Sequence, residues 1–418
     1  MLRRVARGVA SVGVVVLAAV AGLAAAVAAA LVTEAPALVI ASGLVAVFLV
    51  GWGGLALLLR SPRRRARLAA VGAAAALTAV AGVAVAVPTG GGPPAPPVAG
   101  QAFWQLPSGS RIRYVHLRAE GTPRAEPVVF LHGGPGVPDM AGDAAYFHPL
   151  TDHGFDVYVY DQLGAGRSSR LSDPRGYSVE RDVEDLEAIR QRIGAERMIL
   201  VGHSYGTRLA AHYVARHPDR VERVVLLSPG RLDPADASGA NATGLVPTAR
   251  KLRLYLSLLA PRPLLAYLLL QVNPRAAHAF LPDAEADARN DRVLRASAAG
   301  LHCTPSQAHE PAPGSGFYAL QYPQSAGSGS DPDPRPALRG SPTPTLIIKG
   351  SCDYLAWPDH QRIMSDVTLL YYRGAGHNIR QDRPDEVHAA IRAFLTDAPL
   401  PTAPYRQLQA PADFEGPR

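Results

Sequence analysis

The chain has 418 residues, a formal net charge of +7 and two cysteines, Cys303 and Cys352. Because neither cysteine lies in a C-x-x-C pair, the sequence excludes a cysteine-rich zinc or iron–sulfur site. Almost every basic residue is an arginine, a composition typical of a GC-rich bacterial genome. Many of these arginines flank apolar stretches near the N-terminus, so the positive charge indicates membrane topology and not nucleic-acid binding.

Three apolar runs lie near the N-terminus, at 9–32, 37–59 and 68–87. Each is long enough to cross a hydrocarbon core about 30 Å thick at about 1.5 Å per residue. The first run alone also fits a cleaved signal peptide. It is longer than the apolar region of such a peptide, and two further runs follow at once. We therefore predict three transmembrane helices, of which the third, rich in Ala, Gly and Val, carries the weakest signal.

The arginines predict the orientation of these helices. The N-terminus carries Arg3, Arg4 and Arg7, and the loop 60–67 is strongly basic, whereas the loop 33–36 has no basic residue. The positive-inside rule places the first two in the cytoplasm, so residues after 87 reach the outer face of a multi-pass cell-membrane protein. The lipid bilayer is one partner, and the basic loop should also contact anionic headgroups.

Residues 88–97 are rich in Pro and Gly and form a spacer, beyond which short apolar runs alternate with helical patterns. This alternation predicts a mostly parallel α/β sheet with helices on both faces. The expected strands are 111–118, 127–131, 155–160, 198–201, 221–227, 345–349 and 367–371, and the expected helices are 179–193, 209–215 and 385–395. The predicted divisions are an anchor (1–88), a linker (89–99), a core (100–231 and 343–398) interrupted by an insertion (232–342), and a C-terminal tail (399–418).

The alternation stops within the insertion. Residues 251–272 and 283–301 have helical patterns, and 304–342 is rich in Pro, Gly and Ser. We interpret the insertion as a helical cap over the C-terminal edge of the sheet, followed by a long loop. The run 251–272 is also long enough for a fourth span, but Arg253, Pro261, Arg262 and Pro263 interrupt it.

The strongest motif is G-x-S-x-G at 202–206, between an apolar run and a helical pattern. Strand, G-x-S-x-G and helix form the nucleophile elbow of α/β-hydrolases, in which a strained turn exposes the serine above the sheet. The alternative is a chance match of the motif in an ordinary turn, and the strand and helix on either side argue against it. The motif predicts Ser204 as the nucleophile, with Gly202 and Gly206 relieving the turn.

In this architecture the base comes last in the chain and the acid follows the preceding strand. His377 lies after the run 367–371, and Asp353 follows the run 345–349. Ser204 would attack a carbonyl, His377 would accept and return its proton, and Asp353 would hold the imidazole tautomer. Asp359 and Asp366 are alternative acids that fit the position less well.

The oxyanion hole should use the loop after the first central strand together with the amide that follows the nucleophile. That loop reads H-G-G-P-G at 132–136. We expect the N–H groups of Gly134 and Tyr205 to be the two donors, and removing one such donor costs on the order of 3 kcal/mol. The remaining members of the loop motif are His132, Gly133, Pro135 and Gly136.

These motifs, with D-Q-x-G-x-G-x-S at 161–168, together resemble the prolyl iminopeptidase group of α/β-hydrolases, serine peptidases that remove N-terminal residues. The resemblance covers about 98–395 without most of the cap. Leu163 stands where the family usually has Arg, and His203 and Tyr205 stand where it usually has a small residue and Trp. The family holds the substrate amine with cap carboxylates, for which Asp233, Asp236, Asp283, Glu285 and Asp287 are unassigned candidates.

The resemblance implies a membrane-anchored aminopeptidase acting on short peptides. One alternative is an esterase or small-amide hydrolase with the same triad, and another is a catalytically silent binding module. No motif indicates a metal or another cofactor. Cys303 and Cys352 form either a disulfide between the cap and the Asp353 loop or two free thiols, and the sequence leaves both open.

Overall fold

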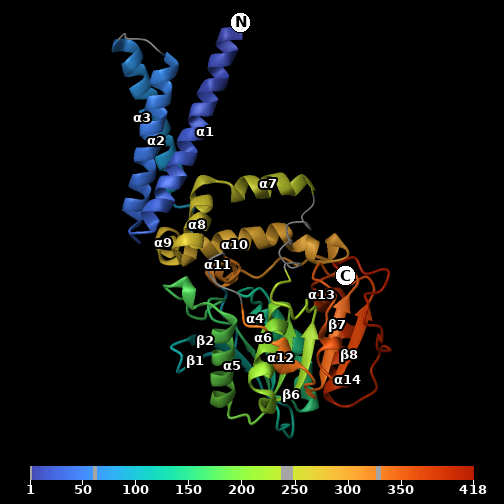
Figure 1. Ribbon diagram of the computed structural model, residues 1–418. Helices are drawn as coiled ribbons and strands as arrows, with labels where there is room; N and C mark the ends of the chain where they lie inside the picture. The colour runs from blue at the N-terminus through green and yellow to red at the C-terminus, as the bar shows by residue number, and fades with distance from the viewer. Residues whose placement is uncertain (1, 60–63, 237–247, 326–330) are drawn as a thin grey trace.

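The computed structural model describes residues 2–59, 64–236, 248–325 and 331–418. In this part of the chain one sheet has the strand order β1-β2-β4-β3-β5-β6-β7-β8 (Figure 1). The β1–β2 and β2–β4 pairs are antiparallel, and all other pairs are parallel, so the mostly parallel sheet is confirmed. The strands are β1 (Gln101–Gln105), β2 (Arg111–Leu117), β3 (Val128–Leu131), β4 (Val157–Tyr160), β5 (Met198–His203), β6 (Val221–Leu227), β7 (Thr345–Gly350) and β8 (Val367–Tyr372).

Helices cover both faces of the sheet, which explains why the central strands are apolar throughout. Along β5, Leu200 packs into the cluster with α5 and α6, while Ile199 and Val201 face the cluster with α4 and α14. Alternate side chains of one strand therefore serve two cores. The four helices are α4 (Met140–Phe147), α5 (Val179–Ile193), α6 (Tyr205–Arg216) and α14 (Pro384–Leu395).

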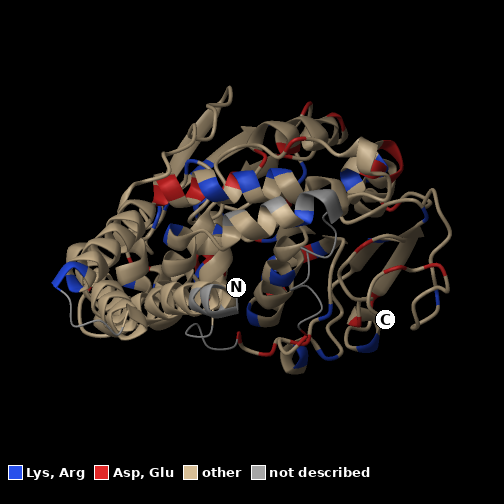
Figure 2. Cartoon of the chain, turned by 90° about the horizontal axis from the view of Figure 1, so that it is seen from above, with Lys and Arg blue, Asp and Glu red and all other residues tan. Residues whose placement is uncertain are grey.

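Three long apolar helices precede the sheet: α1 (Leu2–Ala30), α2 (Pro36–Leu59) and α3 (Arg64–Ala86). All three are long and apolar enough to cross a membrane, and no other helix of the described residues meets that description. Small residues allow α1 and α2 to approach closely, since a side chain at Gly43 would lie 3.0 Å from the Gly22 carbonyl oxygen. The bundle is almost free of charge apart from basic residues near one end (Figure 2). Half of the predicted basic loop, residues 60–63, lies outside the described residues.

The cap lies between this bundle and the sheet (Figure 1). The run 251–272 is not one helix: it divides into α7 (Thr248–Leu258) and α8 (Pro261–Val272), because Pro261 starts a new helix and cannot continue the first. It also does not form a fourth span among the described residues. The predicted loop 304–342 contains short helices. The other cap helices are α9 (Pro274–Phe280), α10 (Asp283–Ser297), α11 (Phe317–Gln321) and α12 (Arg335–Leu338).

Both irregular segments that flank the core with the sheet pack against folded parts of the chain. In the linker, Ala95 is buried, and a side chain at Gly92 would contact Ala288 of the cap. In the C-terminal tail, Phe414 is buried, and the backbone N–H of Trp357 donates to the Pro417 carbonyl oxygen at 2.9 Å. The linker and the tail are therefore parts of the folded domain.

Candidate active site

Ser204 occupies the turn between β5 and α6. Its backbone has φ 53° and ψ −117°, a conformation that costs free energy for a residue with a side chain. The turn requires glycine at two positions, since a Cβ at Gly202 would clash with the Gly206 carbonyl and one at Gly206 with the Leu131 carbonyl. The Ser204 side chain itself is only partly buried. The elbow thus presents a reachable hydroxyl at the N-terminus of a helix.

His377 and Asp353 meet at the same edge of the sheet. His377 Nδ1 donates to Asp353 Oδ1 at 2.8 Å, and both side chains are buried. His377 follows β8 and Asp353 follows β7, so the parallel order of these strands brings their loops together. The Ser204 hydroxyl forms no hydrogen bond with the His377 ring within the described structure, and such bonds are often long before a substrate binds.

The sequence analysis missed Lys349, the ionic partner of Asp353. Lys349 Nζ donates to Asp353 Oδ2 at 2.7 Å and to the Pro229 carbonyl oxygen at 2.7 Å, and the lysine is fully buried at the end of β7. Burial alone would raise the pKa of Asp353, but Lys349 and then His377 outweigh it and lower that pKa to about 2. The signal was a lone lysine in an apolar strand, four residues before Asp353.

A second His–Asp pair supports the loop that carries His377. Asp382 accepts a hydrogen bond from the Gly376 N–H at 2.6 Å and contacts the His302 ring at 2.6 Å. Beside it, Cys303 and Cys352 form a disulfide, which resolves the open alternative in favour of the bridge. The end of the cap is thereby fixed to both loops of the candidate site.

Two side chains next to Ser204 hold the elbow in place. His203 Nε2 donates to the His377 carbonyl oxygen at 3.0 Å, and the two rings lie 5.1 Å apart. Burial lowers the pKa of His203 to about 3, so this ring is neutral near pH 7. On the other side, the Tyr205 hydroxyl donates to Asp182 at 2.7 Å, and burial raises the pKa of Asp182 to about 7.

The loop 132–136 packs directly on the elbow. A side chain at Gly133 would lie 3.0 Å from Ser204 Cβ, whereas the atoms nearest to one at Gly134 belong to Gly136 and Val137. The peptide bond between Gly134 and Pro135 is cis. The Gln162 N–H donates to His132 Nε2 at 2.9 Å, which links this loop to the D-Q motif.

The ion pair behind this loop uses a residue that the sequence analysis did not single out. Arg113 Nε donates to Asp161 Oδ2 at 2.5 Å, and both side chains are buried. Leu163, which stands where the family usually has Arg, is also buried. The guanidinium that neutralises Asp161 therefore comes from β2.

Basic side chains contact several of the candidate cap carboxylates. Asp233, Asp283, Glu285 and Asp287 contact Arg335, His278, Arg262 and Arg170, respectively. The first three contacts lie within the cap and the fourth joins the cap to the core, and none identifies a site for a substrate amine. Among the described residues, no group of three His, Cys, Asp or Glu side chains is placed to hold a metal ion.

Comparisons with known proteins agree with this arrangement. Residues 126–256 match the family described as alpha/beta hydrolase fold. Proline iminopeptidase of Saccharolobus solfataricus is 36% identical over 124 residues, covering 29% of this chain and 38% of that protein. The Neisseria gonorrhoeae proline iminopeptidase is 30% identical over 135 residues, covering 32% of this chain and 43% of that protein. The alignments therefore span about two fifths of these relatives.

Among solved structures, epoxide hydrolase A from Mycobacterium thermoresistibile superposes with a TM-score of 0.51 at 23% identity, covering 72% of this chain and 99% of that one. This likeness supports the fold alone. The chain has an α/β-hydrolase fold, which three apolar helices precede. Over part of their length it is similar to proline iminopeptidases.

Proposed function

We propose that this chain is a membrane-anchored serine hydrolase that removes N-terminal residues from short peptides. The observation that carries the proposal is the strained Ser204 at the start of α6, with the His377–Asp353 pair at the same sheet edge. The similarity to proline iminopeptidases supports the peptide substrate.

In the proposed mechanism, Ser204 Oγ attacks the scissile carbonyl while His377 Nε2 accepts the hydroxyl proton. Asp353 holds Nδ1 protonated through its 2.8 Å hydrogen bond and stabilises the imidazolium. The leaving amine takes the proton from His377, and water then hydrolyses the acyl-enzyme with His377 as base. The N–H groups of Tyr205 and of Gly134 or Gly133 would bind the oxyanion, with Gly133 packed closer to Ser204.

The experiment uses the full chain in detergent with proline and alanine aryl-amides and a fluorophosphonate probe. Ser204→Ala should abolish turnover and labelling. Ser228→Ala is the matched control, because Ser228 directly follows the neighbouring strand β6, also has a positive φ of 54° and is fully buried. Activity or labelling that survives in Ser204→Ala would refute the proposal. Strong ester turnover with no aminopeptidase activity would favour the esterase alternative.

We also propose that the hydrolase domain lies outside the cytoplasm. The Cys303–Cys352 disulfide supports this location, because disulfides persist in oxidising compartments. The N-terminal end of α1 and the beginning of α3, both basic in sequence, lie at the opposite end of the spans from the domain (Figure 1). A reporter active only outside the cytoplasm, fused after Arg418, should be active, and the same reporter fused after Leu59 should be silent.

A further inference from the structure

Exposed apolar side chains gather on one part of the hydrolase domain. Leu31, Val32 and Val87 are exposed where they directly follow α1 and α3. Beyond these and the three spans, the large apolar side chains that are exposed in the described residues lie on or beside α7 and α8, with the exception of Leu408. On α7 and just after it, Leu252, Tyr255, Leu256 and Leu259 are 67%, 46%, 63% and 62% exposed. Their spacing of three and four residues places them on one helical face. Water-soluble surfaces rarely keep such a patch uncovered.

The opposite face of α7 belongs to the domain. Leu254 is buried, so one face of α7 packs against the domain while the other is exposed, and the helix is amphipathic. Figure 1 shows α7 lying across the top of the cap, crosswise to the spans and on the side from which they rise. The sequence of α7 includes three basic residues and no acidic one. An apolar face with basic residues and no acid is the pattern of a helix that lies in a membrane interface.

The contacts between α8 and the spans set the depth of this surface. Arg262 Nη1 donates to the Val85 carbonyl oxygen at the end of α3, at 2.8 Å. Asn273 Nδ2 donates to the Ala30 carbonyl oxygen at the end of α1, at 2.7 Å. Both acceptors are carbonyls at span ends that have no partner in their own helix. The cap helices therefore lie where the hydrocarbon region ends.

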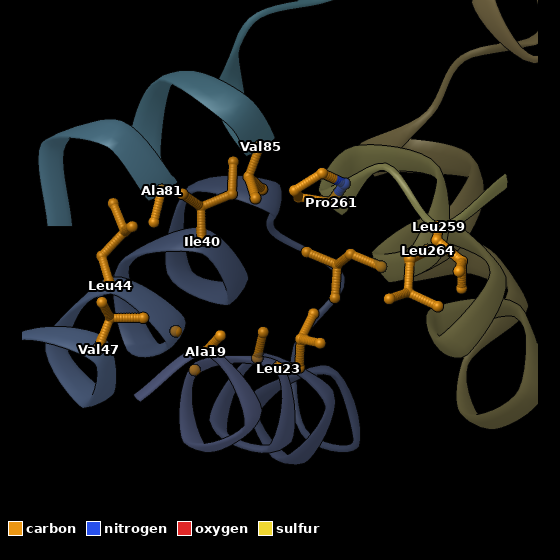
Figure 3. Close-up of a pocket in the computed structure, with 14 residues that line it drawn as sticks. Ala19, Leu23, Ile40, Leu44, Val47, Ala81, Val85, Leu259, Pro261 and Leu264 are labelled. Carbon is orange, nitrogen blue, oxygen red and sulfur yellow. The ribbon is translucent and has the colours of Figure 1, made fainter. Parts of the chain in front are cut away.

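An apolar cavity of about 270 Å³ continues this surface inward between the spans and the cap. Figure 3 shows Leu23, Leu44, Val47 and Val85 of the spans around it, with Leu259 and Leu264 of the cap. All of its lining side chains are apolar. A cavity of this kind holds no stable water but accepts an apolar group.

We propose that the exposed face of α7 and the beginning of α8 bind phospholipid of the leaflet on the side of the hydrolase domain. Acyl chains cover Leu252, Tyr255, Leu256 and Leu259, and one chain enters the cavity. The cap is then an interfacial membrane element, and the edge of the candidate site is held at a fixed height above the bilayer. This inference does not depend on the role of Ser204.

The test places a fluorophore at single engineered cysteines of the full chain in phosphatidylglycerol nanodiscs, without reductant so that the native disulfide stays intact. The positions are Leu256→Cys and, as a second probe of the face, Leu252→Cys. Leu408→Cys is the matched control, because Leu408 is an exposed leucine outside the patch. Lipid with a nitroxide near the top of the acyl chain should remove most of the fluorescence at 252 and 256 and little at 408.

Equal quenching at all three positions, or none, would overturn the proposal. Pyrene excimer emission from Leu256→Cys with no nitroxide quenching would assign the face to a second copy of the chain instead. For the cavity, native mass spectrometry of the full chain with added dioleoyl phosphatidylglycerol should show a retained lipid. Leu264→Trp, which fills the cavity, should lose that lipid while α7 remains quenched, and retention by this variant would refute the cavity part.

Discussion

Two buried ion pairs allow the candidate site to be compared with the junction between cap and spans. Lys349 and Asp353 are four residues apart, at the end of one strand. Arg262 and Glu285 lie on two different cap helices. They also contact Val85 at the end of the anchor and Thr89 at the start of the linker, respectively. The first pair orients one imidazole, whereas the second joins three segments that are distant in sequence. The local pair thus sets the orientation of one side chain in the candidate site, whereas the non-local pair holds the cap against the end of the spans.

The largest expected effect lies at the site and concerns activity. Asp353→Asn keeps the shape of the acid but lets the wrong tautomer of His377 form, so kcat should fall by about 10⁴. The measurement is steady-state aryl-amide hydrolysis by the full chain. Asp366→Asn is the control, because Asp366 precedes β8 and its side chain is exposed. A comparable loss in Asp366→Asn, or none in Asp353→Asn, would reassign the acid.

The next effect concerns the disulfide that joins the end of the cap to the loop of Asp353. The Cys303–Cys352 bridge closes a loop with a sequence separation of 49 residues. The chain-entropy model gives about 4 kcal/mol for a loop of this size. Replacing both cysteines by alanine should therefore lower the free energy of unfolding by about that amount, measured by urea denaturation. A change below about 1 kcal/mol would show that the unfolded chain is already restricted here.

A smaller, local effect is expected at the junction. Arg262→Met leaves Glu285 without its buried partner and should open the cap at a cost of roughly 3 kcal/mol, the low end for such pairs, because Thr89 still donates to Glu285. Limited proteolysis of the linker 88–97 reports this opening. In the double variant with Glu285→Leu no unpaired charge remains, so protection should return. If it does not, the two residues act independently.

The two regions differ in how much of them the sequence predicts, because the candidate site follows from local patterns whereas the junction depends on contacts between distant segments. The sheet follows from runs such as 128–131 and 198–203, whose residues are apolar because both faces are covered. The elbow and the positions of His377 and Asp353 follow from chain order. Strand β1 was missed because Gln101–Gln105 is short, polar at both ends and paired only at the edge. The division of 251–272 follows from Pro261, which the sequence shows, whereas the Arg262–Glu285 pair depends on tertiary contacts that no local pattern contains.

The effect that is smallest for a single step in conditions, one pH unit, is a pH dependence of stability in the core beside the site. The pKa of His203 is about 3 in the folded chain because burial disfavours its charged form, against 6.5 for an unperturbed histidine. As pH falls, the unfolded chain binds a proton at this histidine before the folded chain does. The contribution of the neutral His203 ring to the free energy of unfolding is therefore fully present above pH 6.5 and declines as pH falls toward 3, by at most about 1.4 kcal/mol per pH unit.

The variant His203→Asn retains a donor for the His377 carbonyl and has no proton to gain. The thermal unfolding midpoint of this variant should therefore fall less steeply between pH 6.5 and 4 than that of the native chain. His309→Asn, which changes an exposed side chain, should leave the slope as it is. An unchanged slope in His203→Asn would mean that the ring is solvated in the folded protein, and the elbow would then be more open than its contacts indicate.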